Sequence, residues 1–538
     1  MVQAADGNFY GVTYNGGLTN TAAGAAGGGT VFKMLSDGTL STLYQFGAAS
    51  TDGLNPNGLI QATDGDFYGT TGTGGSVGLG AVFKLTPQGT MTTLASFDGP
   101  HGASPGAGLI QATDGNFYGT TIAGGSAGQG TIFKATASGT LTTLYSLGTN
   151  PDDVANPVAA LLQAADGNFY GTTYTGGAGN CPSLIFKSTG CGSIFKITPA
   201  GAFSTLHRFA ADFSDGINPA SQLIQAKDGN FYGTANGGGA NQSGTFFKFT
   251  QAGAFSVVYN FGSNSTDGAH PGWSIVQGAD GNFYGITSQG GSSSLCAHGC
   301  GTLFQIAPSG EETELQFFGS SLQDGRLPGA TPIFGADGNV YGTTATGGAN
   351  GTGTIYRYSF PAALPAITGV LNGAGFQPNI GAGAWTTING TNFTTTTDSW
   401  LIVNGVLPTS LDGVSVTIGG QPAYIEYISP TQINAIAPDV PAGSVPVIVT
   451  NANGASQAVN AQLAAEAPAF FQWGTYAVAT RQDFSLAVKN GTFSITTTPA
   501  KPGDVIILWG TGFGATSPPA PAGKQTPSDT TYNTAAAV

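Results

Sequence analysis

The chain has 538 residues, of which 88 are Gly and 29 are Pro, and its 28 acidic and 14 basic side chains give a net charge of −14. Glycine at this frequency excludes a long helical or coiled-coil protein, because it breaks helices throughout the chain. The scarcity of Lys and Arg argues against nucleic acid as a partner, while an apolar fraction of 40% is too high for a disordered chain.

A hexapeptide of the form Asp-Gly-(Asn/Asp)-(Phe/Val)-Tyr-Gly recurs through most of the chain. Its seven copies begin at Asp6, Asp64, Asp114, Asp166, Asp228, Asp280 and Asp337. Spacings of 50 to 62 residues are typical of propeller blades or solenoid repeats. The third unit contains four short apolar runs, LIQA, NFYGTT, GTIFKAT and TLTTLYSL, separated by hairpin turns rich in glycine. Four antiparallel strands in each of seven units predict a seven-bladed β-propeller over residues 1–360, with a parallel β-helix as the alternative.

Both ends of this repeat region are incomplete. The first unit starts inside its innermost strand at Met1, and the seventh stops after its third strand at residues 354–358. Outer strands are recognisable in six units, beginning at Leu40, Met91, Leu141, Phe203, Phe255 and, less clearly, Glu312. We therefore predict that the last blade lacks its outer strand, which would be supplied from upstream of Met1.

Four cysteines occur as two close pairs, Cys181 with Cys191 and Cys296 with Cys300. Even numbers of cysteines in loop-rich sequence favour disulfides, so we expect these two pairings and an oxidising compartment. A metal site through Cys296, His298 and Cys300 is the alternative, but no fourth ligand is evident. Neither a signal peptide nor a membrane-spanning apolar segment is visible. We expect a secreted or cell-surface protein whose signal peptide and anchor are not in this sequence.

After the Pro-bounded linker at residues 360–365, the repeat is replaced by short strands at close intervals. Such spacing over about 100 residues predicts an immunoglobulin-like β-sandwich at residues 366–465. The sequence GTGF at residues 510–513 repeats GTNF at 390–393, and the chain ends 25 residues later. Residues 466–538 are therefore predicted to be an incomplete second module, and the whole chain is expected to be all-β.

The unit with DGNFYGTT at its head, followed by GTIFK and TLTTLYSL, resembles the tandem repeats of the GloVer-containing, or choice-of-anchor, secreted bacterial proteins. This resemblance implies an exported, propeller-like protein that a C-terminal module attaches to the cell surface, without an established activity. Residues 366–538 resemble IPT/TIG immunoglobulin-like modules through GTNF, VTIGGQPA, ISPTQINAIAP and VPVIVTNANGAS. That resemblance implies a spacer or display role.

A second repeated element, Asp-Gly-x-x-Pro, links the outer strand of one unit to the inner strand of the next. Its aspartates are Asp52, Asp215, Asp267 and Asp324, with looser versions at Asp98 and Asp153. All such links fall on one face of a propeller, so their carboxylates could surround the channel mouth and bind cations or sugar hydroxyls. The alternative, favoured by their repetition, is that Asp caps a turn and Pro sets the entry to the next strand.

Other polar residues recur at fixed positions of the unit. His101 and His270 lie in the links near two of these aspartates and are the nearest approach to an acid/base cluster. A glutamine three residues before the repeat aspartate, such as Gln111, is expected to bond backbone or a neighbouring blade. A lysine after the third-strand Phe, such as Lys134, is interpreted as an outward residue that keeps the surface soluble.

These features predict an exported, surface-displayed propeller that acts as a binding or adhesion module for extracellular polysaccharide or another cell-surface polymer. The residues expected to contact the ligand are the six link aspartates and the two histidines of the channel face. No catalytic residue, metal ligand or cofactor is predicted. A glycosidase or lyase that uses channel-face carboxylates is one alternative, and a purely structural surface or matrix protein is another.

Overall fold

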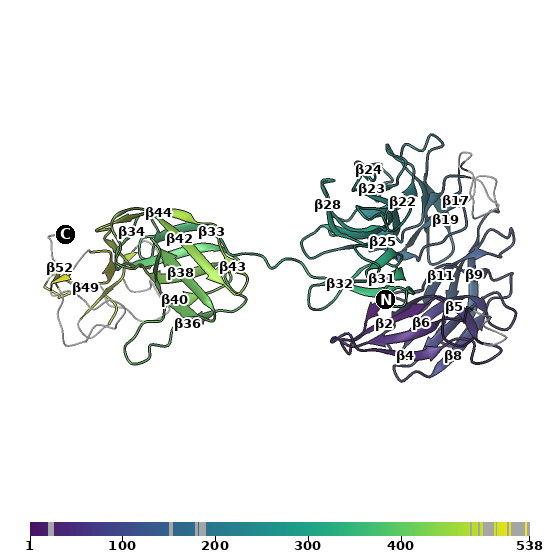
Figure 1. Ribbon diagram of the computed structural model, residues 1–538, viewed down its shortest axis with the longest axis horizontal. Helices are drawn as coiled ribbons and strands as arrows, with labels where there is room; N and C mark the ends of the chain where they lie inside the picture. Colours follow the sequence, from purple (N-terminus) through teal and green to yellow (C-terminus); the bar gives the residue numbers. More distant parts are fainter. Residues whose placement is uncertain are drawn as a thin grey trace. The chain divides into compact units, whose positions relative to one another are not determined.

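The chain forms two compact units, Met1–Phe360 and Pro361–Val538 (Figure 1). The computed structural model describes residues 1–19, 26–149, 154–177, 181, 190–473, 476–481, 485–487, 500–501, 503–513, 516–517 and 533–534. Every regular element within these residues is a strand, so the prediction of an all-β protein is confirmed. None of the described segments is a helix with the length and apolarity needed to cross a membrane.

The first unit is a series of antiparallel sheets that follow one another along the chain and around a common centre (Figure 1). The first sheet contains β1 (Val2–Gln3), β2 (Phe9–Thr13), β3 (Thr30–Met34) and β4 (Leu40–Gln45). The second contains β5 (Gly53–Gln61), β6 (Phe67–Gly74), β7 (Ala81–Leu85) and β8 (Met91–Ser96). The third contains β9 (Ala103–Pro105), β10 (Ile110–Gln111), β11 (Phe117–Ala123), β12 (Thr131–Ala135) and β13 (Leu141–Ser146). The four runs predicted for the third unit thus correspond to β10 to β13.

The remaining sheets of this unit repeat the pattern. The fourth contains β15 (Leu162–Gln163), β16 (Phe169–Thr173), β18 (Ser193–Ile197) and β19 (Phe203–Arg208), beside the short pair β14 (Val154–Ala155) and β17 (Thr175–Gly176). The fifth contains β20 (Ile217–Pro219), β21 (Ile224–Gln225), β22 (Phe231–Gly237), β23 (Thr245–Phe249) and β24 (Phe255–Asn260). The sixth contains β25 (Gly268–Gln277), β26 (Phe283–Gly290), β27 (Thr302–Ile306) and β28 (Glu312–Phe317). The seventh contains β29 (Gly325–Pro328), β30 (Ile333–Phe334), β31 (Val340–Gly347) and β32 (Thr354–Tyr358).

In the second and sixth sheets the inner strand, β5 or β25, begins further upstream than the sequence predicted, because the Asp-Gly-x-x-Pro link itself pairs with the second strand. In the third, fifth and seventh sheets the link forms a separate short strand, β9, β20 or β29, that pairs with the second strand. In the second sheet, Gly53 pairs with Gly74 and Pro56 pairs with Thr71 before the register shifts. The residue before the proline adopts a positive φ in each link: Asn55 (59°), Ser104 (50°), Asn156 (53°), Asn218 (54°), His270 (55°) and Leu327 (56°). This left-handed position favours Asn. The link is therefore a bulged extension of the inner strand.

The first and last sheets of this unit lie side by side. The rings of Phe9 on β2 and Tyr341 on β31 pack with their centroids 4.3 Å apart, and the two strands are adjacent in Figure 1. The backbone N–H of Ala336 donates a hydrogen bond of 2.7 Å to Oε1 of Gln3. Within the described residues, β32 is the last strand of its sheet and no outer strand pairs with it. Chain segments more than 300 residues apart are thus joined.

Aromatic side chains of the repeat fill the space between neighbouring sheets. The Tyr of one sheet packs on the Phe of the next, as Tyr118 does on Phe169 with ring centroids 4.2 Å apart. Equivalent pairs are Tyr10–Phe67, Tyr68–Phe117, Tyr170–Phe231 and Tyr232–Phe283. Because both faces of each sheet are covered, its strands are apolar on both sides.

The third-strand lysines, interpreted from the sequence as outward residues, also make a specific contact that was not predicted. Nζ of Lys134 lies 2.9 Å from Oδ2 of Asp114 and 5.6 Å from the ring centroid of Tyr118. The same arrangement recurs at Lys33, Lys84, Lys196 and Lys248. Each lysine therefore pairs with the aspartate of its own hairpin turn and covers the neighbouring tyrosine.

The second unit contains two facing sheets. One sheet consists of β33 (Ala366–Asn372), β35 (Trp385–Thr391), β41 (Gln432–Ile436), β40 (Tyr424–Ile428) and β36 (Asp398–Ser399). The other consists of β34 (Ile380–Gly381), β44 (Val459–Ala464), β42 (Gly443–Asn451), β38 (Val414–Ile418) and β37 (Ser410–Leu411), with β39 (Gln421–Pro422) and β43 (Gly454–Ala455) at its side. Aliphatic residues of both sheets, among them Ile388, Val416 and Ile433, form one buried core. This is the packing of a β-sandwich.

Short strand pairs follow the sandwich. They are β45 (Ala469–Phe470) with β50 (Gly510–Thr511), β46 (Gln472–Trp473) with β47 (Tyr476–Ala477), β48 (Ala479–Thr480) with β49 (Ile507–Leu508), and β51 (Thr516–Ser517) with β52 (Asn533–Thr534). Ala469 pairs with Thr511 as Ala366 pairs with Thr391 in the sandwich. The repeated GT(N/G)F sequence thus begins the same strand pairing twice.

Candidate binding site at the junctions between sheets

The link aspartates accept hydrogen bonds from their own loops. Asp52 is buried and accepts a hydrogen bond of 2.8 Å from the Tyr44 hydroxyl and one of 2.9 Å from the N–H of Gly47. Comparable pairs of partners are His207 and Ala210 for Asp215, Tyr259 and Ser263 for Asp267, and the N–H and hydroxyl of Ser320 for Asp324. Asp153 lies outside the described residues. These contacts are those expected of capped turns.

Asp98 and His101 are brought together as the sequence suggested. Nδ1 of His101 lies 2.8 Å from Oδ2 of Asp98, and the N–H of His101 donates a hydrogen bond of 2.9 Å to Oδ1 of Asp98. Both side chains are about half exposed. The carboxylate orients the imidazole while leaving its other nitrogen for a ligand.

His270 makes a different contact. Its Nδ1 lies 2.9 Å from the carbonyl oxygen of Asn236 on the preceding sheet. The amide of Asn55 donates the equivalent hydrogen bond of 3.0 Å to the carbonyl oxygen of Tyr14. His270 thus occupies a link position where other links carry Asn, and no hydrogen bond among the described residues joins it to Asp267.

The outer strands of neighbouring sheets meet at a recurring contact. The fifth residue of one outer strand packs on the first residue of the next, as Tyr145 of β13 does on Phe203 of β19 with ring centroids 4.3 Å apart. His207 stacks on Phe255 in the same way, with centroids 3.9 Å apart. We call each such contact a junction and number it by the two sheets that it joins. Aromatic stacking fills these two junctions.

The junction between the second and third sheets is open. The position of Tyr145 is taken by Ala95, and the position of Phe203 by Leu141. The link is also shorter, with seven residues between Phe97 and Pro105 where the first link has nine between Phe46 and Pro56. A depression of about 730 Å³ lies beside this junction, between the short link and the outer strand β13.

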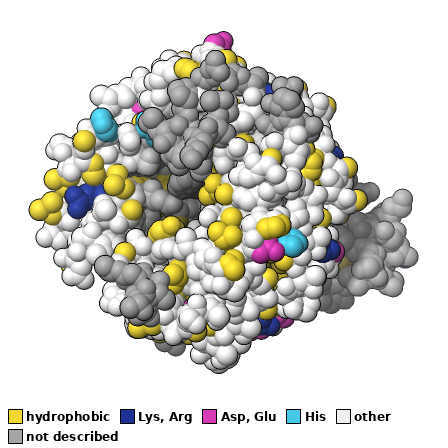
Figure 2. Space-filling model, turned by 90° about the vertical axis from the view of Figure 1, so that its right-hand side faces the viewer, with side chains coloured by type: hydrophobic (Ala, Val, Ile, Leu, Met, Phe, Trp, Pro, Cys, Tyr) yellow, Lys and Arg dark blue, Asp and Glu magenta, His cyan; other side chains and the backbone are white. Residues whose placement is uncertain are grey.

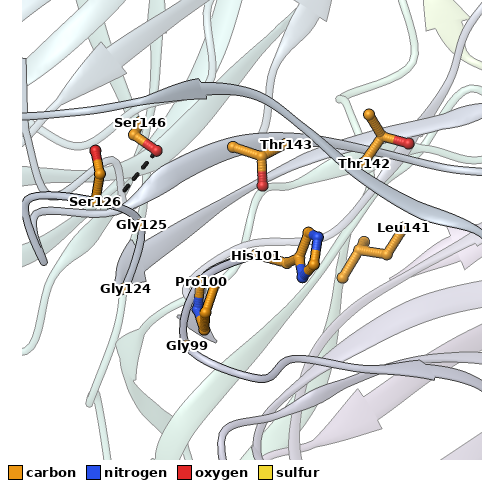
Figure 3. A pocket seen from close by; sticks show the side chains of 10 residues that line it. All are labelled: Gly99, Pro100, His101, Gly124, Gly125, Ser126, Leu141, Thr142, Thr143 and Ser146. Atoms are coloured by element: carbon orange, nitrogen blue, oxygen red, sulfur yellow. Dashed lines mark hydrogen bonds between the residues drawn. The ribbon is translucent and has the colours of Figure 1, made fainter.

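The walls of this depression carry hydroxyl groups and one imidazole (Figure 3). Its side chains are His101, Ser126, Leu141, Thr142, Thr143 and Ser146, and two glycine-rich loops complete it. Figure 3 shows the Thr143 hydroxyl directed towards His101, and this hydroxyl has no hydrogen-bond partner among the described residues. Charged side chains are scattered over the face shown in Figure 2. The described residues that line the depression include no Lys, Arg, Asp or Glu. The depression is thus suited to an uncharged ligand rich in hydroxyl groups.

The junction between the fifth and sixth sheets carries acids instead of a second ring. Glu312 stands at the position of Phe203, and the Tyr259 hydroxyl lies 3.4 Å from its Oε2. Glu314 and Asp267 complete a group of three carboxylates with one oxygen each within 4.8 Å of the others. Burial, reinforced by the neighbouring carboxylates, raises the pKa of Glu312 to about 7 and that of Glu314 to about 8.

Sequence reasoning did not find this acidic group or the pairing of His207 with Asp215. The pairing of His207 with Asp215 could have been predicted from the sequence, because an aromatic residue lies eight positions before Asp52, Asp215 and Asp267 alike. The sequence also pointed to the acidic group, since Glu312 begins an outer strand whose counterparts all begin with an apolar residue. Both of the predicted disulfides, Cys181–Cys191 and Cys296–Cys300, are present, with Cα atoms 4.9 and 5.2 Å apart.

Solved structures of propeller and other proteins give weak matches to this chain. An auxiliary nutrient binding protein from Bacteroides thetaiotaomicron matches at 10% identity and a TM-score of 0.37, covering 65% of this chain and 77% of that one. A PQQ-bound aldose sugar dehydrogenase from Streptomyces coelicolor matches at 15% identity and a TM-score of 0.34, covering 58% and 96%. No function is inferred from these likenesses, and no curated protein gives a significant sequence match.

Two family models match the sequence itself. An IPT/TIG domain model matches residues 376–464, which comprise most of the β-sandwich. A model described as Gloeobacter/Verrucomicrobia repeat matches residues 1–186 and 186–399, well over half of the 538 residues. The chain belongs to the Gloeobacter/Verrucomicrobia repeat family and carries a C-terminal IPT/TIG domain.

Proposed function

We propose that the chain is a secreted or cell-surface binding module. In this proposal residues 1–360 are a closed seven-bladed propeller whose last blade lacks its outer strand. Residues 366–465 and the incomplete module at 466–538 act as immunoglobulin-like spacers. The contact between Phe9 and Tyr341 supports ring closure, and the two disulfides are typical of an oxidising, extracellular compartment.

The ligand in this proposal is a neutral extracellular polysaccharide or another hydroxyl-rich surface polymer. The observation that carries it is the open junction between the second and third sheets, where ring stacking is replaced by a depression lined with hydroxyl groups. His101, oriented by Asp98, would hydrogen-bond a sugar hydroxyl together with Thr142 or Ser146. Among the described residues, ring stacking is absent at this junction, whereas the hydrogen bonds to the link aspartates recur in several links. A feature that departs from the repeat supports a ligand site better than one that recurs with it.

A glycan array probed with the full chain tests this proposal. We expect binding to neutral polysaccharides and a loss of about tenfold in affinity for His101→Ala, since one or two hydrogen bonds to the ligand are removed. The matched control is His298→Ala, which removes an exposed histidine between the cysteines of the second disulfide. Absence of binding to any neutral glycan would favour the purely structural alternative. Equal losses of affinity in both variants would mean that the glycan does not bind in this depression.

The enzymatic alternative has one observation in its favour. Glu312 and Glu314 are an asymmetric pair of acids with raised pKa, as a general acid and base would require. However, one oxygen of each is closed to solvent, which favours a binding role over hydrolysis. Release of reducing sugar from a bound glycan, lost in Glu314→Gln, would establish the enzymatic alternative instead.

A further inference from the structure

We propose that Asp267, Glu312 and Glu314 hold a calcium ion at the junction between the fifth and sixth sheets. This site is separate from the depression at the junction between the second and third sheets, and it does not depend on a glycan ligand. It would join the link before the sixth sheet to the outer strand β28 of that sheet.

The three carboxylates are close enough to share one ion. One oxygen from each lies within 4.8 Å of the others. Calcium binds carboxylate oxygens at about 2.3–2.6 Å, so an ion placed among oxygens with this spacing can reach all three. In calcium sites, carboxylate side chains usually supply only part of the coordination sphere, and water or backbone carbonyls supply the rest.

Two of the carboxylates, Asp267 and Glu314, each have one oxygen held by a donor. The Tyr259 hydroxyl donates a hydrogen bond of 2.8 Å to Oδ2 of Asp267 and lies 3.4 Å from Oε2 of Glu312. The N–H of Gly268 donates a hydrogen bond of 2.6 Å to Oε1 of Glu314. These donors orient the carboxylates before any ion binds.

The other oxygen of each carboxylate is buried and lacks a partner. Oδ1 of Asp267, Oε1 of Glu312 and Oε2 of Glu314 have no hydrogen-bond partner among the described residues. Asp267 is only 4% exposed. A buried carboxylate oxygen without a partner carries a large desolvation cost. A cation bound by the three carboxylates would offset this cost.

The fold does not require acids at these positions. The residues that correspond to Glu312 and Glu314 in the five preceding outer strands are Leu40 and Thr42, Met91 and Thr93, Leu141 and Thr143, Phe203 and Thr205, and Phe255 and Val257. An apolar residue followed by Thr or Val therefore suffices to build this strand. The two glutamates are a local addition that faces a link aspartate.

The donor set selects the kind of ion. Carboxylate and hydroxyl oxygens are hard ligands that favour calcium or magnesium, whereas zinc and copper sites are built from His and Cys. Magnesium demands near-ideal octahedral geometry and retains several waters, while calcium accepts irregular sets of ligands. Three carboxylates held on a link and a strand form an irregular set, which favours calcium.

Terbium luminescence offers a direct test, because Tyr259 lies against the site and can transfer excitation to a bound lanthanide. With the full chain freed of metal by EDTA, we expect Tb³⁺ emission on tyrosine excitation and its displacement by Ca²⁺. The emission should be lost in Glu314→Gln and in Glu312→Gln. It should persist in Glu311→Gln, which removes an exposed acid from the same segment outside the group.

Thermal unfolding provides the second measurement. At 10 mM Ca²⁺ we expect Tm of the native chain and of Glu311→Gln to rise by about 3 °C or more, as for extracellular sites of millimolar affinity or better. Glu314→Gln and Glu312→Gln should show no such rise, whether or not their own Tm differs from that of the native chain. An unchanged Tm in the native chain, an equal rise with Mg²⁺, or a rise retained in both glutamine variants would overturn the proposal.

Discussion

At the scale of single residues, each hairpin turn of the repeat is held by a small polar cluster. Oδ2 of Asp114 accepts hydrogen bonds of 2.9 Å from the amide of Asn116, 2.8 Å from the Tyr118 hydroxyl and 2.9 Å from Nζ of Lys134. Burial alone would raise the pKa of such carboxyls, but these donors outweigh it and hold the pKa of Asp114 far below its usual range. The pKa of Asp228 is lowered to about 2 by its own set of donors. The acidic excess of the chain thus includes paired turn residues.

These pKa shifts predict acid-sensitive stability. The unfolded carboxyl titrates near pH 4, whereas the folded one titrates at about 2 or below. The stabilisation is therefore complete above about pH 5, and it is lost as the pH falls from about 4 towards the folded pKa. We expect the urea midpoint of the first unit to fall steadily between pH 5 and pH 2. A midpoint that stays constant over this range would contradict the assigned clusters.

At the scale of elements, glutamines on the inner strands connect neighbouring sheets. Oε1 of Gln61 accepts a hydrogen bond of 2.8 Å from the N–H of Ala5 in the preceding sheet, while its amide donates one of 3.0 Å to the carbonyl oxygen of Gly65 in its own turn. The same double contact is made by Gln3, Gln111, Gln163, Gln225 and Gln277. Phe334 replaces glutamine in the seventh sheet and packs on Tyr284 instead.

Removing one of these amides should loosen two sheets. For Gln111→Ala we expect the free energy of unfolding to fall by about 1–2 kcal/mol, because two hydrogen bonds are lost and the N–H of Thr63 is left without its acceptor. The control Gln316→Ala removes an exposed amide that bonds only the adjacent residue and should change it by less than about 0.5 kcal/mol. Urea unfolding followed by tyrosine fluorescence measures both. Equal effects of the two variants would mean that the inter-sheet bond adds nothing.

The strands of the repeat could be predicted from the sequence because their signals are local. Apolar runs bounded by Asp-Gly turns mark β10 to β13 correctly, and close spacing suffices to pair Cys296 with Cys300. The acidic group could not be predicted in this way, since Gly268 and Glu314 lie 46 residues apart and meet only when the whole sixth sheet has folded. The pairing of Lys134 with Asp114 was missed for the same kind of reason, as it crosses from the third strand to the turn.

At the scale of the whole molecule, equivalent junctions have different contents. Aromatic rings fill the junctions between the third and fourth and between the fourth and fifth sheets. Carboxylates occupy the junction between the fifth and sixth sheets, and the junction between the second and third sheets is open to solvent. No outer strand of the seventh sheet meets Leu40, the first residue of β4, among the described residues, and Leu40 is 58% exposed. A repeated scaffold thus supplies several copies of one location, and the residues at two positions of the outer strand differ from one copy to the next.

The most direct test of this account is to close the open junction with the residues found at a filled one. The double variant Ala95→Tyr/Leu141→Phe recreates at the second junction the pair formed by Tyr145 and Phe203. We expect it to fold with an unchanged or higher Tm, because stacked rings add buried contact, and to lose glycan binding measured by affinity electrophoresis in polysaccharide gels. A folded variant that binds neutral glycan as tightly as the native chain would contradict the account.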